Sequence, residues 1–196
     1  MNKNIEDYIF LKENFLEDDF CYHITDVLGK ASWKLKSLEV AGVALEDLPK
    51  ESELLDFNIL SNKILQSEID KIEAEMMKKI PDVLVEYLSY LNFDWLRGWT
   101  GYSGIKWNRY SLGQGMMKHW DNVNSVLEGE VTGVPFLSLI GFLNDDYEGA
   151  NLILCEDKKI DAKKGNLLLF PSSFMYPHKV TPLTKGTRYS FVSWVY

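Results

Sequence analysis

Cysteine and long apolar runs are both scarce in this sequence, and each absence removes a class of protein. Only Cys21 and Cys155 occur in 196 residues, so we expect two free thiols in a reducing compartment and no disulfide scaffold. No stretch approaches the roughly 18–20 apolar residues that a transmembrane helix needs. The opening MNKNIEDYIFLKENF lacks the basic start, apolar run and small-residue cleavage site of a secretory signal. We therefore expect a cytoplasmic protein that has no membrane partner.

Positive charge is also in short supply. Lys and Arg number 21 against 29 Asp and Glu, which gives a formal net charge of −8. Nucleic-acid binding depends on Lys and Arg that neutralise phosphates, so no nucleic-acid partner is expected. The content of 46% hydrophobic and 26% charged residues is that of a globular chain. Its length suffices for one domain with a sizeable core.

The first half of the chain has a largely helical pattern. Residues 7–12 predict a short strand, and apolar residues at helical spacing over 15–30 predict a helix that ends near Gly29. Residues 36–56 contain Pro49 and clustered acids, which favour a loop or short turns.

A longer helical pattern covers residues 58–90. Pro81 interrupts it, and because proline is tolerated in a first helical turn, we expect a second helix to begin there. The polar residues between the apolar ones are expected to form a solvated face. The apolar positions of the two segments are Leu65, Ile69, Ile72 and Met76, then Leu84, Tyr87, Leu88 and Leu91.

Short apolar runs separated by turn-forming residues dominate the chain after about residue 100. Such runs predict the strands of an all-β sandwich, barrel or jelly roll. We expect one domain of class α+β, with helical support over about 1–92 packed on the outside of a β core over about 100–196. The runs are IKWNRY, GMMKHW, VPFLSLIGFLND, ANLILC, NLLLFP, HKVTPL and RYSFVSWVY.

Only three histidines occur, and His119 stands two residues before Asp121. On a strand these two side chains point to the same face, where both can bind one metal ion. His178 begins a later strand-like run and is the candidate third ligand. Two histidines and one carboxylate form the facial triad of non-haem Fe(II) oxygenases. Zinc with a bound water accepts the same ligand set.

Several neighbouring residues have plainer interpretations. His23 lies within the predicted N-terminal helix and is expected to be packed or half-exposed there. Trp120 would point to the opposite face of its strand from the two ligands, and it is expected to pack. For Trp95, Trp99 and Trp107 we favour packing over stacking on a substrate.

Arg188 stands in an otherwise apolar, aromatic strand, GTRYSFVSW. A buried arginine needs an anionic partner because an unpaired buried charge is very costly. A guanidinium matches a carboxylate in bidentate fashion. That carboxylate can belong to an Asp or Glu of the chain or to a bound anion. Ser190 shares the strand face with Arg188 and can add a hydroxyl to the same anion.

The order HxD, a distal His and then an Arg resembles the 2-oxoglutarate- and Fe(II)-dependent dioxygenase superfamily. Further similarity to its prolyl 4-hydroxylase-like branch covers about residues 105–196. YIFLKENFLEDDFCYHI resembles, less specifically, the strand and helix that open the family's catalytic domain. The resemblance implies a double-stranded β-helix, or jelly-roll, core. Its motifs here are NRYSLGQGMMKHWDN, LIGFLNDDYEGANLIL and IDAKKGNLLLFPSSFMYPHKVTPLTKGTRYSFVSW.

Carried over by position, the resemblance assigns site residues of two kinds. The Fe(II) ligands, which are also the catalytic residues, are His119, Asp121 and His178. The residues for 2-oxoglutarate are Arg188 on its distal carboxylate, Tyr110 as a hydroxyl donor and Ser190 in support. Tyr110 also has an alternative interpretation as an ordinary core aromatic.

This chain departs from the family pattern at a few positions. Ala150 follows Gly149 where the family often has a second glycine, and Phe142 stands where it has a tyrosine. Many collagen-type relatives have lysine where this chain has Arg188, so the resemblance is closer to the arginine-bearing members. Trp194 and Leu152 stand where the family lines its pocket. None of these departures removes a metal ligand.

The resemblance implies a dioxygenase that hydroxylates a C–H bond, with a prolyl residue of a peptide or protein as the favoured target. It implies Fe(II), 2-oxoglutarate as cosubstrate and O₂, with ascorbate as a candidate reductant. A free amino acid or another small molecule is the alternative substrate. Two alternatives belong to other classes, namely a non-catalytic jelly-roll binding module and a zinc hydrolase. Arg188 disfavours both, because neither needs a buried arginine beside the triad.

Overall fold

Strands supply most of the regular structure in the computed structural model, which describes residues 3–35, 53–55, 63–93, 99–122 and 134–196. In chain order the elements are η1 (Ile5–Tyr8), β1 (Phe10–Lys12), α1 (Asp18–Gly29), β2 (Trp33–Leu35), β3 (Glu53–Leu55), α2 (Lys63–Leu91), β4 (Lys106–Tyr110), β5 (Met116–His119), β6 (Leu137–Phe142), β7 (Glu148–Gly149), β8 (Leu152–Leu154), β9 (Lys158–Lys159), β10 (Leu167–Pro171), β11 (His178–Val180), β12 (Leu183–Lys185) and β13 (Arg188–Val195).

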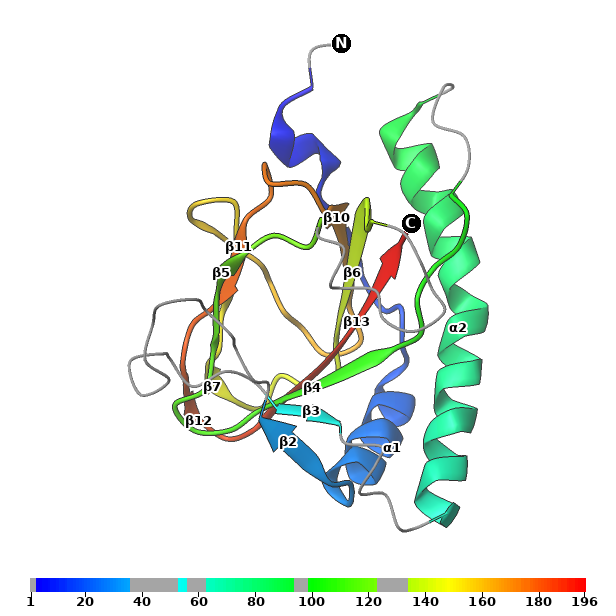
Figure 1. Ribbon diagram of the computed structural model, residues 1–196, viewed down its shortest axis with the longest axis vertical. Coiled ribbons are helices and arrows are strands. Elements are labelled where there is room, and N and C mark those ends of the chain that lie inside the picture. Colours follow the sequence, from blue (N-terminus) through cyan, green and yellow to red (C-terminus); the bar gives the residue numbers. More distant parts are fainter. Residues whose placement is uncertain (1–2, 36–52, 56–62, 94–98, 123–133) are drawn as a thin grey trace.

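The strands form two facing layers (Figure 1). The larger layer is an antiparallel sheet in the order β1-β10-β6-β13-β4-β3-β2. The smaller layer contains the sheet β5-β11-β8-β9 and the pair β12-β7. Helices α1 and α2 lie against the outer side of the larger sheet (Figure 1). The predicted α+β class with a jelly-roll core is therefore confirmed.

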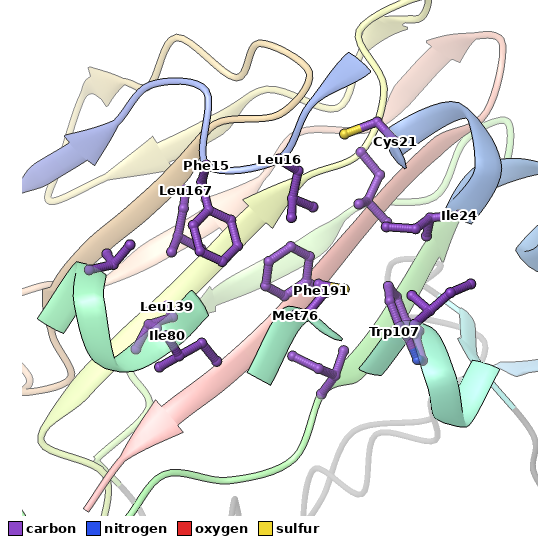
Figure 2. Close-up of a cluster of buried hydrophobic side chains, with 14 of the residues drawn as sticks. Phe15, Leu16, Cys21, Ile24, Met76, Ile80, Trp107, Leu139, Leu167 and Phe191 are labelled. Atoms are coloured by element: carbon purple, nitrogen blue, oxygen red, sulfur yellow. The ribbon is translucent and has the colours of Figure 1, made fainter. Parts of the chain in front are cut away.

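The side chains of β10 alternate between two hydrophobic cores, one under the helices and one between the two sheet layers. Leu167 and Leu169 pack with the helices, whereas Leu168 and Phe170 pack between the two layers. Successive side chains of a strand point to opposite faces, so a strand buried on both faces is apolar throughout. Figure 2 shows the core under the helices, where the labelled residues are Phe15, Leu16, Cys21, Ile24, Met76, Ile80, Trp107, Leu139, Leu167 and Phe191.

Gly141 marks a close approach inside the larger sheet. It pairs with Phe191 of β13, and a Cβ built on it would lie 1.9 Å from the Phe191 ring carbon Cε1. Any larger residue would therefore collide with this ring and displace it from its place in the core under the helices. The glycine in the otherwise apolar run LSLIGF is explained by that contact.

Two predictions for the first half are only partly right. The strand expected over 7–12 is shorter, because residues 5–8 form the 3₁₀ helix η1 and only Phe10–Lys12 pairs with β10. The loop expected over 36–56 contains strand β3 at Glu53–Leu55, and residues 36–52 lie outside the described residues. Strand β3 gains its ladder from β2 and β4, a non-local pairing that local composition does not reveal.

Helix α2 is continuous, so the prediction that Pro81 begins a second helix is wrong. Proline removes one helical hydrogen bond and typically costs about 3 kcal/mol in a helix interior. Burial of apolar residues at helical spacing on both sides of Pro81 compensates for this cost. The buried positions are Leu65, Ile69, Ile72, Met76, Ile80, Val83, Leu84, Tyr87 and Leu91.

Replacing Pro81 with alanine should stabilise the protein. Pro81 is exposed, so the change restores the N–H donor without disturbing the core, and we expect about 1–3 kcal/mol more unfolding free energy. Urea denaturation would measure it. Lys78→Ala, another exposed change on α2, should stay within about 0.5 kcal/mol of the parent. Equal midpoints for Pro81→Ala and the parent would contradict the prediction.

Candidate metal centre

Two histidines meet where strands β5 and β11 pair. His119 is the last residue of β5 and His178 the first of β11, and they are direct partners in the antiparallel register. Their ring centroids are 4.3 Å apart. Asp121 joins them, and one ligand atom from each of the three residues can be chosen so that all lie within 4.8 Å of one another. The structure thus brings the predicted triad together.

Backbone carbonyl groups set the orientation of both rings. Nδ1 of His119 lies 2.7 Å from the carbonyl oxygen of Met117, and Nδ1 of His178 lies 3.3 Å from that of Tyr176. A carbonyl oxygen only accepts, so Nδ1 must carry the proton in these hydrogen bonds. In the neutral ring Nε2 then presents a lone pair.

The triad is a set of electron-pair donors that face one another. Nε2 of His119 lies 3.5 Å from Oδ1 of Asp121, and Nε2 of His178 lies 3.8 Å from Oδ2. Asp121 and His178 are buried, whereas His119 is partly exposed. Two imidazole lone pairs and a carboxylate repel one another unless a cation lies between them. The donor set therefore fits a metal ion, and the open side is at His119.

Asp121 is held as an ionised carboxylate. Burial raises the pKa of its carboxyl group, but His119 and His178, which are cationic whenever Nε2 holds a proton in place of a metal ion, and the indole N–H of Trp194 together outweigh burial, so the pKa lies well below its ordinary value. Oδ2 accepts hydrogen bonds from Ser138 Oγ at 2.8 Å and Trp194 Nε1 at 3.0 Å. The sequence suggested Trp194 as pocket lining only, and it missed Ser138. The signal for Ser138 was a hydroxyl in the apolar run FLSLIGF.

The expectation that His119 and Asp121 share one strand is wrong, because β5 ends at His119 and Asp121 follows in a bend. The backbone N–H of Asn122 donates to the carbonyl oxygen of Ser172 at 3.0 Å, and its side-chain amide donates to the carbonyl of Pro135. These two contacts hold the bend, so tertiary hydrogen bonds and not strand geometry position the carboxylate.

Trp120 also corrects an expectation. It was expected to pack on the far face of the strand, but its side chain is 47% exposed. Since the strand ends one residue earlier, the alternation argument does not apply to it. An exposed indole therefore lies in the sequence between two of the three triad residues.

Arg188 is a buried cation between the two sheet layers. It begins β13 opposite Tyr110 of β4, is 1% exposed, and its guanidinium carbon lies 4.8 Å from the centroid of the Tyr110 ring. One Nη donates to the carbonyl of Ala150 at 3.2 Å, and Nε has no hydrogen-bond partner in the described parts of the chain. No carboxylate among these residues forms a salt bridge with it. The guanidinium therefore fits an anionic ligand.

Tyr147 belongs to the same environment and was missed from the sequence. Burial raises the pKa of its hydroxyl, and the charge and hydrogen bond of Arg188 partly offset that rise. Ser190 is buried on the same side of β13 as Arg188, opposite Asn108 and Phe142. The hydroxyl groups of Tyr147 and Ser190 thus belong to the same interior side of the larger sheet as the guanidinium.

The remaining candidates lie away from this site. His23 is exposed on α1, 3.7 Å from Glu68 and stacked on Phe20, as a half-exposed helix residue would be.

Trp107 is buried on the helix side and donates to Glu73 at 2.6 Å, which confirms packing. Burial is the main reason that the pKa of Glu73 is raised. Trp99 packs against the same core, and Trp95 lies outside the described residues.

Leu152 of β8 is buried in the core between the layers. Within the described segments, no helix has the length and apolar character that crossing a bilayer requires.

Comparison with known proteins gives a match to residues 105–196. This segment matches the family model described as 2OG-Fe(II) oxygenase superfamily. A PKHD-type hydroxylase of Alteromonas mediterranea is 34% identical over 98 residues, which are 45% of this chain and 41% of that protein. One of Idiomarina loihiensis is 33% identical over 92 residues, 45% of this chain and 39% of the relative. The chain thus spans about two fifths of the length of these curated relatives.

Solved structures extend the likeness to nearly the whole chain. A prolyl hydroxylase of Trichoplax adhaerens, in complex with a hypoxia inducible factor peptide fragment, superposes with a TM-score of 0.64 at 21% identity, covering 97% of this chain and 84% of that one. The viral collagen prolyl hydroxylase of Paramecium Bursaria Chlorella virus-1, in complex with 2OG, gives 0.60 at 14% identity over 96% and 94%. At such identities the likeness shows the fold.

Proposed function

We propose, because residues 105–196 match the family model of the 2OG-Fe(II) oxygenase superfamily, that this protein is a 2-oxoglutarate- and Fe(II)-dependent dioxygenase. Its reaction would be hydroxylation of a C–H bond, with a prolyl residue of a peptide or protein as the target. One observation carries the proposal. The triad His119, Asp121 and His178 shares the interior of one jelly roll with Arg188, a buried guanidinium whose Nε has no partner among the described residues.

The three triad residues would hold Fe(II). Bound Fe(II) and 2-oxoglutarate together activate O₂, so that one oxygen atom enters the substrate C–H bond and the other enters succinate as CO₂ is released. Three protein ligands leave the remaining positions free for cosubstrate and O₂. The carbonyl groups of Met117 and Tyr176 keep the two histidine rings in their ligand orientation.

Arg188 would bind the distal carboxylate of 2-oxoglutarate. Its N–H groups form a planar fork that matches a carboxylate, and its guanidinium carbon lies over the Tyr110 ring. Tyr110 and Ser190 would contribute hydroxyl groups from the neighbouring positions of β4 and β13. A zinc hydrolase or a non-catalytic binding module gives no reason to bury this cation, so Arg188 favours the dioxygenase.

The names of the structural neighbours support a peptide or protein substrate. The Trichoplax enzyme is described in complex with a peptide fragment, and the viral enzyme as a collagen prolyl hydroxylase. The exposed side of the site at His119 leaves a path for an extended chain to reach it. No nucleic-acid partner is proposed, because the net charge is −8.

We further infer a single domain over 1–196 in the cytoplasm. Helices α1 and α2 share one continuous core with the larger sheet, which favours one folding unit. Cys21 and Cys155 are free thiols, as a reducing compartment would keep them. Burial raises the pKa of the Cys21 thiol to about 11, so this residue stays an unreactive part of the core.

The decisive test of the activity is succinate release from 2-oxoglutarate with added Fe(II). Proline-containing peptides and free amino acids are then screened for a gain of about 16 Da, one oxygen atom. A mass gain on peptides supports the proposed substrate class, and a gain on free amino acids alone overturns it. Ascorbate as a reductant stays a prediction, tested by running the assay with and without it. Absence of succinate under all conditions would refute the dioxygenase.

Replacing the exposed Trp120 with alanine should weaken substrate binding. An indole beside the triad can cover part of a bound peptide, and losing such an aromatic contact costs about 1.4 kcal/mol or more, so KM for a substrate peptide should rise about tenfold. Metal affinity and kcat should change little. Tyr90→Ala on α2 is the control, because Tyr90 is 46% exposed against 47% for Trp120. An unchanged KM for Trp120→Ala would exclude this contact.

A further inference from the structure

We propose that Ser138 and Ser172 are positioning residues that lock one oxygen of Asp121, so that the carboxylate presents only its other oxygen to the metal. The inference rests on the proposed role of the triad as a metal site. Ser138 lies on β6 and Ser172 follows β10, and neither matches a metal-ligand motif. All three residues are buried, with Ser138 and Ser172 each 1% exposed.

The first step is the distribution of hydrogen bonds on Asp121. Oδ2 receives two charge-assisted bonds, one from Ser138 Oγ and one from Trp194 Nε1. Oδ2 also lies 3.8 Å from Nε2 of His178, but these two donors occupy its lone pairs. Oδ1 faces Nε2 of His119 at 3.5 Å, so it is the oxygen that remains for a metal ion. A carboxylate held in this way would offer a metal ion only one oxygen.

The second step is the direction of the serine chain. Ser138 has a single hydroxyl hydrogen, which it donates to Asp121. Its oxygen lies 2.8 Å from Ser172 Oγ and can only accept there, so Ser172 is the donor. The chain runs from Ser172 through Ser138 to the carboxylate. A hydroxyl that accepts one hydrogen bond becomes a stronger donor of the next.

The third step is that strand pairing and a backbone hydrogen bond bring Ser138, Trp194 and Ser172 together at Asp121. Ser138 pairs with Trp194 across the β6–β13 ladder and with Phe170 across the β10 ladder. The carbonyl oxygen of Ser172 accepts the N–H of Asn122, the residue after Asp121. Ser172 thus fixes both the bend that carries Asp121 and the hydroxyl that orients it. Two buried hydroxyls in an apolar core are costly without such partners, and the carboxylate supplies the partner.

Metal binding to the full-length, metal-stripped protein tests the inference without any turnover. Co(II) is titrated in and followed by its visible absorption, and Mn(II) by loss of the free-ion magnetic resonance signal. Loss of a hydrogen bond to a metal ligand typically costs 10–100-fold in affinity, so Ser138→Ala should weaken Co(II) binding about tenfold. Its absorption bands should also change, because a carboxylate held by Trp194 alone can rotate and offer both oxygens.

Ser172→Ala should weaken binding less than Ser138→Ala, because Ser172 acts through Ser138. The double variant should bind no more weakly than Ser138→Ala alone, since removing Ser138 already disconnects Ser172. Ser193→Ala is the matched control. Ser193 is also buried on β13, but its hydroxyl donates to the carbonyl of Ser103 on the other side of the sheet. Its metal affinity should equal that of the parent.

Co(II) affinity within twofold of the parent for Ser138→Ala, with unchanged bands, would overturn the inference. Unfolding of each metal-free variant is measured alongside, and if Ser138→Ala does not fold, Ser172→Ala decides alone, with parent-like affinity counting against the proposal. Failure of the proposed function looks different, because the parent would then release no succinate while Ser138→Ala still weakened Co(II) binding. A parent that binds no metal at all would refute both.

Discussion

Replacing His178 with alanine should abolish metal binding and succinate release together. The change removes one of three converging ligands. The two that remain, His119 and Asp121, are not enough to retain a divalent ion at micromolar concentration. A change in a group that merely supports a ligand costs 10–100-fold, so loss of the ligand itself should exceed about 100-fold. Co(II) titration and succinate release, measured on the same preparation, would report both losses.

A structural side effect must be separated from this loss. His178 is buried and its ring lies edge-on to Phe170, with centroids 5.1 Å apart, so alanine also leaves a cavity between the sheet layers. The unfolding transition of the metal-free variant measures that cost. His23→Ala, a histidine removed from the surface of α1, should leave both readouts unchanged. Succinate release retained by a folded His178→Ala variant would exclude the triad as the catalytic metal site.

The β core could be predicted from the sequence because its strands are delimited by local signals. The run Leu167–Pro171 ends at a proline, and the run Arg188–Val195 begins at a charged residue just after Gly186. The meeting of the three triad residues could be predicted because ligand chemistry restricts the choice. Only three histidines occur, and one of them stands two residues before Asp121. The predictions of the β core and of the triad both depend on short-range pattern and residue type, which can be read from the sequence alone.

The features that could not be predicted all depend on distant contacts. The bend at Asp121 is set by hydrogen bonds from Asn122 to segments far along the chain. Ser172 and Ser138 are two ordinary serines until β6 and β10 pair. Pro81 suggested a helix start because the cost of a proline inside a helix is a local property. The burial of α2 against the sheet, which offsets that cost, depends on residues elsewhere in the chain.

Arg188→Met should weaken the binding of 2-oxoglutarate while leaving the ligand-free protein as stable as the parent or more stable. Removing one partner of a buried, hydrogen-bonded ion pair costs about 3–5 kcal/mol, so the affinity for 2-oxoglutarate should fall at least about 100-fold. Without 2-oxoglutarate, however, the parent carries a buried cation whose Nε is unpaired within the described residues. Methionine fills a similar volume with no charge, and such exchanges are commonly neutral or stabilising by about 1–4 kcal/mol.

Arg188→Lys is the matched variant, because it keeps the charge and loses the planar fork. It should bind 2-oxoglutarate more tightly than Arg188→Met and more weakly than the parent. The measurements are the KM for 2-oxoglutarate in succinate release and urea denaturation with and without 2-oxoglutarate on metal-loaded protein. Saturating 2-oxoglutarate should raise the midpoint of the parent and leave that of Arg188→Met unmoved, since only a bound ligand stabilises the fold. A variant that is less stable without ligand, yet has a parent-like KM, would show that Arg188 serves the core and not an anion.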